Sequence, residues 1–90
     1  MRRDLALVLD RRVPAATVID TIAQLNQPLL ESIEIFDVYT GEGIPADKKS
    51  VALSLRYRHK ERTLTDEEVN RAHEELVRHV LPRLDAQMRQ

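Results

Sequence analysis

Three residue types that can hold a nucleobase fall close together in residues 36–50, which read FDVYTGEGIPADKKS. Asp37 supplies hydrogen-bond acceptors, Tyr39 a flat ring and Ser50 a small hydroxyl group. An aromatic ring can stack on a base, and a carboxylate can accept hydrogen bonds from a base edge. These side chains can act together only if the chain reverses between Tyr39 and Ser50.

The same segment predicts such a reversal. The residues before Thr40 favour extended structure, and an apolar alternation resumes at Val51. Between them, Gly41 and Gly43 free the backbone and Pro45 restricts it. We therefore expect two neighbouring antiparallel strands that bring the acceptor, the ring and the hydroxyl together.

The strand before the reversal, residues 29–40, has an irregular pattern. Its apolar residues fall in two phases, Ile33 and Ile35 in one and Phe36 and Val38 in the other. A bulge near residues 35 and 36 would keep both phases in the core. The outer face would then carry Glu34, Asp37 and Tyr39. A regular strand with a partly covered second face is the alternative, and it also leaves Asp37 and Tyr39 side by side.

The strand after the reversal, residues 49–59, alternates cleanly. Its inward residues are Val51, Leu53, Leu55 and Tyr57, and its outward residues are Ser50, Ala52, Ser54, Arg56 and Arg58. Small outward residues leave room for a flat ligand, and the guanidinium groups of Arg56 and Arg58 would suit its phosphates. Solvation of these two side chains is the alternative interpretation.

Positive charge is concentrated in the same region. The chain has a net charge of −1, yet residues 48–62 carry six basic residues against the single acid Glu61. Residues 15–47 carry six acids and no Lys or Arg. The basic block could meet phosphate, or it could protect a sheet edge from pairing with another chain.

The composition excludes several classes of function. Cysteine is absent, which excludes disulfides, thiolate catalysis and thiolate metal sites and is compatible with a reducing compartment. No apolar run is long enough to span a membrane, so we expect a cytoplasmic protein without a membrane partner. Ninety residues without a composition break predict one domain over residues 1–90. Because Met1 directly precedes a strand pattern, we expect this domain to be excised from a longer chain.

The remaining segments predict two helices and two more strands. Residues 3–10 alternate as a strand with two apolar faces, and residues 14–25 repeat apolar residues at helical spacing after Pro14. Thr65 and Glu68 form a capping box that opens a second helix, with Leu64 and Val69 as its hydrophobic staple.

The end of the second helix is less clearly defined. Pro82 predicts that the helix stops near residue 80 or 81. Residues 84–89 then alternate as a short last strand, and a continued, kinked helix is the alternative. His73 lies on the buried stripe of the helix and is interpreted as a packed residue. The resulting order, βαββαβ, predicts a ferredoxin-like α+β sandwich with both helices on one face of a four-stranded antiparallel sheet.

Motifs along the whole chain resemble the ferredoxin-fold anticodon-binding domain that ends the β subunit of bacterial phenylalanyl-tRNA synthetase and the single-chain organellar enzyme. The motifs are DLALV at residues 4–8, LES at 30–32, FDVY at 36–39, GEGIP at 41–45, KKS at 48–50 and ERTLTDEEV at 61–69. Asp85 and Pro82 depart from the family pattern, so the C-terminal end is the part that the resemblance covers least well.

The resemblance implies binding of the anticodon stem-loop of phenylalanine tRNA. In the family, the tyrosine at the position of Tyr39 stacks on the first anticodon base, and the residues at Asp37 and Ser50 hydrogen-bond that base. The residues expected to contact the RNA backbone are Lys48, Lys49, Arg56 and Arg58. The implied partners are the tRNA, the rest of the β subunit and the α subunit. The domain itself would hold no cofactor and catalyse nothing, because the enzyme uses ATP and magnesium elsewhere.

Two other functions fit the same predicted fold. Acylphosphatases use an arginine in the loop that Arg11 and Arg12 occupy here, but they also need an asparagine that neither Asn26 nor Asn70 is placed to supply. A regulatory or assembly module that binds a small ligand or a protein partner is the other alternative. A general RNA-recognition module is disfavoured, because the outward face of residues 49–59 carries no aromatic ring.

Overall fold

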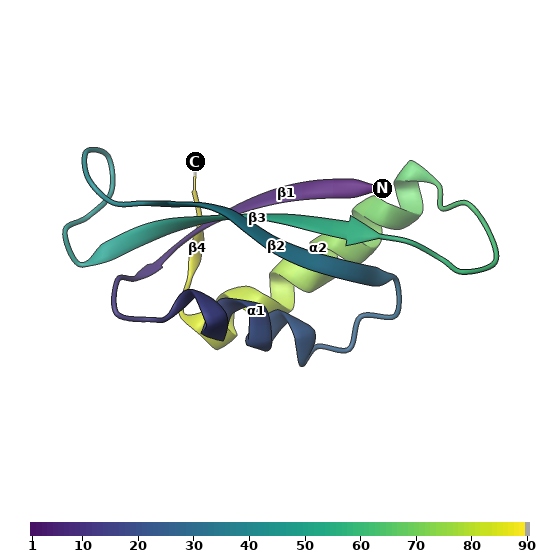
Figure 1. Ribbon diagram of the computed structural model, residues 1–90, viewed down its shortest axis with the longest axis horizontal. Coiled ribbons are helices and arrows are strands. Elements are labelled where there is room, and N and C mark those ends of the chain that lie inside the picture. Colours follow the sequence, from purple (N-terminus) through teal and green to yellow (C-terminus); the bar gives the residue numbers. More distant parts are fainter. Residues whose placement is uncertain (90) are drawn as a thin grey trace.

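The computed structural model describes residues 1–89 and confirms the ferredoxin-like order βαββαβ (Figure 1). The elements are β1 (Arg2–Asp10), α1 (Ala15–Ala23), β2 (Leu30–Tyr39), β3 (Lys48–Tyr57), α2 (Asp66–Leu84) and β4 (Gln87–Met88). Pro14 is the N-cap of α1 and not its first helical residue, and α1 ends two residues before Leu25. No helix within residues 1–89 is long and apolar enough to cross a membrane.

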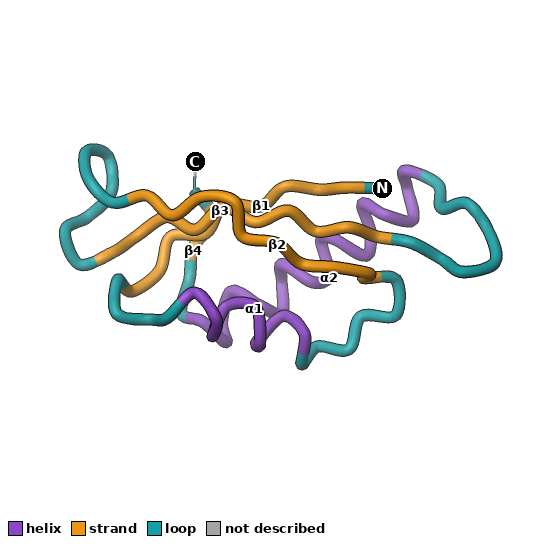
Figure 2. The backbone as a smooth tube through the Cα atoms, in the orientation of Figure 1, coloured by secondary structure: helices purple, strands orange, loops and turns teal. Residues whose placement is uncertain are grey.

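The sheet has the strand order β2-β3-β1-β4, and the neighbouring strands are antiparallel. Both helices lie on one face of the sheet, and neither covers the other face, which we call the open face (Figures 1 and 2). The molecule is elongated, with extents of 45 × 22 × 20 Å. A long, uncovered sheet surface is therefore available for a ligand.

The core lies between the sheet and the two helices. Its sheet side is formed by Leu5, Leu7, Leu9, Val51, Leu53, Leu55 and Tyr57, and its helix side includes Val18, Ile22, Val69, Leu76 and Val80. The sheet residues alternate along β1 and β3, as the sequence predicts, because successive side chains of a strand point to opposite faces. The intervening side chains consequently form the open face.

A bulge at Phe36 sets the faces of β2. Ile35 is the register partner of Leu53 and Asp37 that of Ala52, so Phe36 is the extra residue. This confirms the predicted bulge. The expectation that Phe36 and Val38 enter the core is wrong, since 53% and 49% of their surfaces are exposed. Both residues lie on β2, which is an edge strand of the sheet, whereas Val51, the partner of Val38 on the inner strand β3, is fully buried.

The predicted start of α2 is confirmed, whereas its predicted end is wrong. The capping box is present: the backbone N–H of Glu68 donates to Thr65 Oγ1 at 3.2 Å, and the Glu68 carboxylate accepts from the Thr65 N–H. The expected stop near residue 81 is wrong, because the helix continues through Pro82 to Leu84. Pro82 removes only one donor, and burial of Leu84 in the core favours the extra turn.

The helix ends where the backbone of Asp85 turns left-handed, at φ 49°. The N–H of Ala86 then donates to the Leu81 carbonyl at 2.9 Å, which satisfies a carbonyl at the helix end. The last strand is confirmed but short, because β4 comprises only Gln87–Met88. β4 pairs with β1 at the edge of the sheet.

Candidate nucleic-acid interface

Two adjacent rows of side chains cross three strands of the open face. The register places Val8, Ser50 and Tyr39 in the first row and Ala6, Ala52 and Asp37 in the second. Direct register partners lie about 5 Å apart. The structure thus brings Asp37, Tyr39 and Ser50 together, as the sequence predicts. We call these three residues the base-site trio.

The Tyr39 ring is fixed against the loop of the β2–β3 hairpin. Its hydroxyl group donates a hydrogen bond to the Glu42 carbonyl at 2.9 Å. Gly41 has φ 131°, and a Cβ atom at this position would lie 3.4 Å from the Tyr39 hydroxyl. Glycine therefore suits both the backbone and the close approach of the ring. The side chains of Ala6 and Ala52, in the neighbouring row, are small and leave space above the sheet.

An arginine outside the predicted set, Arg89, covers two members of the trio, Tyr39 and Ser50. Arg89 follows β4, and its backbone N–H donates to the Ala6 carbonyl at 3.0 Å. Its side chain extends from there across the open face. Its guanidinium carbon lies 5.3 Å from the centroid of the Tyr39 ring. Its Nη1 donates to Ser50 Oγ at 3.4 Å. Ser50 is only 2% exposed beneath it.

Two further cations lie close to the hairpin loop. Lys48 is partly exposed at the start of β3, and Arg11 donates from Nη1 to the Ala46 carbonyl at 3.3 Å. Together with Gly41 they line a cavity of about 370 Å³. From the sequence pattern, Arg11 is assigned only to a possible enzyme site. The contact between the β1–α1 and β2–β3 loops, which brings Arg11 here, has no local sequence signal.

A carboxylate beside these cations stays ionised. Asp10 is the register partner of Lys48, and hydrogen bonds from the side chain and backbone of Arg12 lower the pKa of Asp10 to about 2. The Arg12–Asp10 ion pair measures 3.1 Å. Arg12 is thus largely neutralised by its own neighbour, and Lys48 and Arg11 are better placed to meet a phosphate.

Lys49 lies on the other face of the sheet, away from the trio. It is the register partner of Leu9, and only 9% of its surface is exposed. Its ammonium group donates to the backbone carbonyl of Val13, which leads into α1. In this conformation Lys49 ties the sheet to α1 and does not reach the open face.

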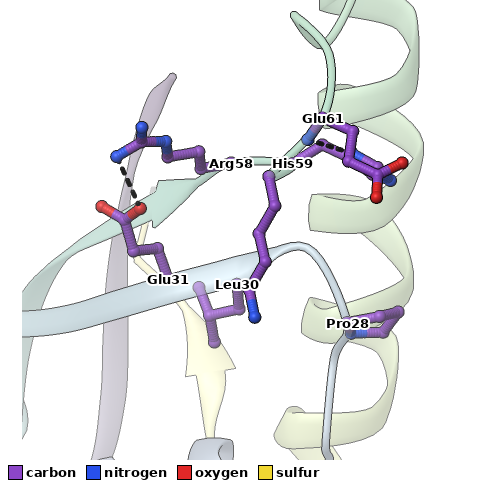
Figure 3. Close-up of a pocket in the computed structure, with 7 residues that line it drawn as sticks. Pro28, Leu30, Glu31, Arg58, His59 and Glu61 are labelled. Atoms are coloured by element: carbon purple, nitrogen blue, oxygen red, sulfur yellow. Dashed lines mark hydrogen bonds and ion pairs between the residues drawn. The ribbon is translucent and has the colours of Figure 1, made fainter.

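Arg56 and Arg58 stand at the far end of the open face. Arg56 is six residues from Ser50, or roughly 20 Å along an extended strand. Arg58 points toward Glu31, with Nη1 3.5 Å from Glu31 Oε2, and both line a cavity of about 680 Å³ (Figure 3). The register row between the two ends carries Asp4 and Glu34. The structure therefore places these arginines apart from the trio, across an acidic row.

His73 has a structural partner in the helix layer. Its Nδ1 lies 3.0 Å from the hydroxyl oxygen of Tyr57, and the two rings meet edge to face. Burial lowers the pKa of His73 and raises the pKa of Tyr57 to about 12. The pair is therefore neutral at physiological pH, which agrees with the interpretation of His73 as a packed residue.

Comparison with known proteins identifies similar sequences over the same residues. The model of the ferredoxin-fold anticodon binding domain matches residues 1–89. The chain is 48% identical over 87 residues to the phenylalanine–tRNA ligase beta subunit of Shouchella clausii, and 46% identical over 89 residues to that of Hahella chejuensis. These alignments cover 97% and 99% of this chain and 11% of each relative. The chain thus spans about a tenth of the length of the curated relatives it matches.

Proposed function

Because the chain belongs to the family of ferredoxin-fold anticodon binding domains, we propose that its open face binds the anticodon stem-loop of phenylalanine tRNA. The observation that carries this proposal is the placement of Asp37, Tyr39 and Ser50 in two adjacent rows of an uncovered sheet. The match to phenylalanine–tRNA ligase beta subunits supports the choice of tRNA.

Each member of the trio has a role that follows from its chemistry. The Tyr39 ring, held at its hydroxyl end by Glu42, offers a preset surface on which the first anticodon base stacks. The exposed Asp37 carboxylate accepts hydrogen bonds from the edge of that base. The Ser50 hydroxyl contributes one more hydrogen bond once it is uncovered. Stacking supplies affinity, and the two polar groups supply base preference.

Backbone phosphates adjacent to this base meet Lys48 and Arg11 beside the hairpin loop. Arg56 and Arg58 would contact RNA only further along the stem-loop, because roughly 20 Å separates Arg56 from Ser50. Arg58 must also exchange its Glu31 partner for a phosphate. Lys49 is left out of the proposed contacts, since its ammonium group bonds the Val13 carbonyl on the opposite side of the sheet.

In this proposal the chain recognises tRNA and leaves aminoacylation to other parts of a phenylalanine–tRNA ligase. Its partners are the tRNA, the remainder of the β subunit and the α subunit. ATP and magnesium act elsewhere in that enzyme, and this domain holds no cofactor.

The direct test is fluorescence anisotropy of a labelled phenylalanine anticodon stem-loop, titrated with the 90-residue chain at low and moderate salt. We expect binding that weakens as salt rises, because phosphate contacts release counterions. Replacing the first anticodon base should weaken binding, and Tyr39→Ala should weaken it about tenfold through the lost stacking.

A matched control variant is Phe36→Ala. Phe36 is also an exposed aromatic residue of β2, but it lies at the bulge and outside the trio. Its loss should leave the affinity unchanged within twofold or so. Equal losses from Tyr39→Ala and Phe36→Ala, or no binding even at low salt and high protein concentration, would contradict the proposal.

A further inference from the structure

Arg89 obstructs the very groups that the proposed base site needs. With Arg89 in place, Ser50 is 2% exposed, and its hydroxyl accepts a hydrogen bond from the guanidinium group. The same guanidinium lies over the Tyr39 ring, at 5.3 Å from its centroid. A base therefore cannot stack on this side of Tyr39 or bond Ser50 until Arg89 moves.

The required movement is small. A flat base between two other flat groups needs a separation of about 7 Å, because each of the two contacts spans about 3.5 Å. The present distance from the Arg89 guanidinium carbon to the Tyr39 centroid is 5.3 Å, so the guanidinium group must move by at least about 2 Å. The hydrogen bond to Ser50, already long at 3.4 Å, breaks in the same step.

We propose that Arg89 is the fourth residue of the base site, and that the first anticodon base inserts between the Tyr39 ring and the Arg89 guanidinium. This inference rests on the proposed function. A guanidinium plane stacks on bases as it does on tyrosine, so Arg89 exchanges one flat partner for another. Its withdrawal also uncovers the Ser50 hydroxyl for the incoming base. One side chain thus closes the free site and forms a wall of the occupied one.

The position of Arg89 in the fold supports a defined movement of the side chain alone. Its backbone N–H is held by the Ala6 carbonyl at 3.0 Å, so the backbone of residue 89 stays beside β1 while the side chain moves. Charge favours the same role. Arg89 places a positive charge directly beside Tyr39 and Ser50, whereas the acid Asp37 lies in the next row.

The test compares Arg89→Ala and Arg89→Lys by titration of the labelled phenylalanine anticodon stem-loop with the 90-residue chain. The lysine variant keeps the charge and removes the plane. We expect both variants to bind about tenfold more weakly, as for the loss of one stacking partner. The charge-matched control is Arg78→Ala, which removes an exposed cation from α2 on the opposite face of the sheet and should change the affinity less than twofold.

A second RNA, abasic at the first anticodon position, separates stacking from phosphate contact. If Arg89 stacks on the base, Arg89→Ala weakens binding of the abasic RNA no further, since the two changes remove the same contact. Equal losses on both RNAs, or full recovery of affinity by Arg89→Lys, would identify a phosphate contact and overturn the inference. Tighter binding by Arg89→Ala would show that Arg89 only blocks the site, and this result would also overturn the inference.

Failure of the inference and failure of the proposed function give different results. Wild-type binding that Tyr39→Ala weakens and Arg89→Ala does not would refute the role of Arg89 and leave the proposed function standing. Absence of wild-type binding would refute both. A cooperative thermal unfolding transition for each variant is the control that the variant is folded.

Discussion

The hydroxyl group of Tyr39 lies 2.9 Å from the carbonyl oxygen of Glu42 and donates a hydrogen bond to it. This bond closes the β2–β3 hairpin loop onto the ring that we propose as the stacking surface. The loop can approach so closely because Gly41, with φ 131°, has no side chain. The orientation of the ring is therefore set within the hairpin itself, before any RNA arrives.

Tyr39→Phe keeps the ring and removes its attachment to the loop. One net hydrogen bond is worth about 1 kcal/mol, so we expect stem-loop binding to weaken about fivefold, less than for Tyr39→Ala. Anisotropy titration of both variants checks this order. Wild-type affinity in the Phe variant would show that packing alone orients the ring, and a loss as large as that of Ala would show that the hydroxyl contacts RNA directly.

Lys48 and Lys49 are adjacent in sequence but should behave differently, because they lie on opposite faces of β3. We expect Lys48→Ala to reduce the slope of log affinity against log salt by about 1 and to change stability by less than about 0.5 kcal/mol. Lys49→Ala removes a charged hydrogen bond to the Val13 carbonyl and should cost about 2 kcal/mol of unfolding free energy, with the salt slope unchanged.

Urea unfolding and salt-dependent titration of the two lysine variants measure both quantities. The reversed pattern, a reduced salt slope for Lys49→Ala with no loss of stability, would mean that Lys49 leaves the inner face and reaches the RNA.

Thr65→Ala should destabilise the fold, because it removes the acceptor for the Glu68 N–H at the start of α2. The expected loss is about 1 kcal/mol of unfolding free energy, seen as a lower urea midpoint with an unchanged slope. Thr63→Ala, two residues earlier and outside the capping box, is the matched control and should stay within about 0.5 kcal/mol of wild type. Equal effects of the two variants would argue against the cap.

The charge of Glu68 should make stability depend on pH in the acid range. Hydrogen bonds from Arg62 and from the Thr65 N–H lower the pKa of Glu68 from 4.5 to about 2. The unfolded chain therefore takes up this proton first as the pH falls, so the stabilisation is complete above about pH 5 and is lost between there and pH 2.

Urea unfolding of wild type and Glu68→Gln at several pH values between 2 and 7 tests this dependence. Wild type should be the more stable protein at pH 7, and the difference should shrink steadily as the pH approaches 2. A difference that stays constant across this range would mean that the carboxylate charge contributes nothing to the fold.

Much of the site could be predicted from local sequence. The alternation after Val51 fixes which residues of β3 face outward, and the phase slip before Phe36 predicts the bulge that brings Glu34 onto the face of Asp37 and Tyr39. These features follow from strand geometry and neighbouring residues alone. The same alternation already assigns Lys49 to the inner face, two residues before Val51. The run of positive charge nevertheless suggested an RNA contact there.

Other features depend on which segments lie over one another. Phe36 and Val38 are exposed because they lie on the edge strand β2 and not on the covered inner strand β3, and α2 passes Pro82 because Leu84 is buried in the core. Helix coverage and burial are properties of the packed molecule. The apolar character of Phe36 and Val38 did not reveal that they would be exposed. The helix-breaking tendency of Pro82 predicted an earlier helix end, because the burial of Leu84 could not be read from the sequence pattern.

The sequence by itself determined the order of elements and the capping box at Thr65, because both depend on interactions within a few residues. It also predicted that Asp37, Tyr39 and Ser50 lie together, because the strand patterns on either side of one hairpin indicate their pairing. Only the tertiary structure placed Arg89 over Tyr39 and Ser50. That contact joins residues 39 positions apart or more and exists because β4 pairs with β1 at the edge of the sheet. Strand pairing between distant segments, which no local pattern encodes, therefore brings Arg89 to the proposed site.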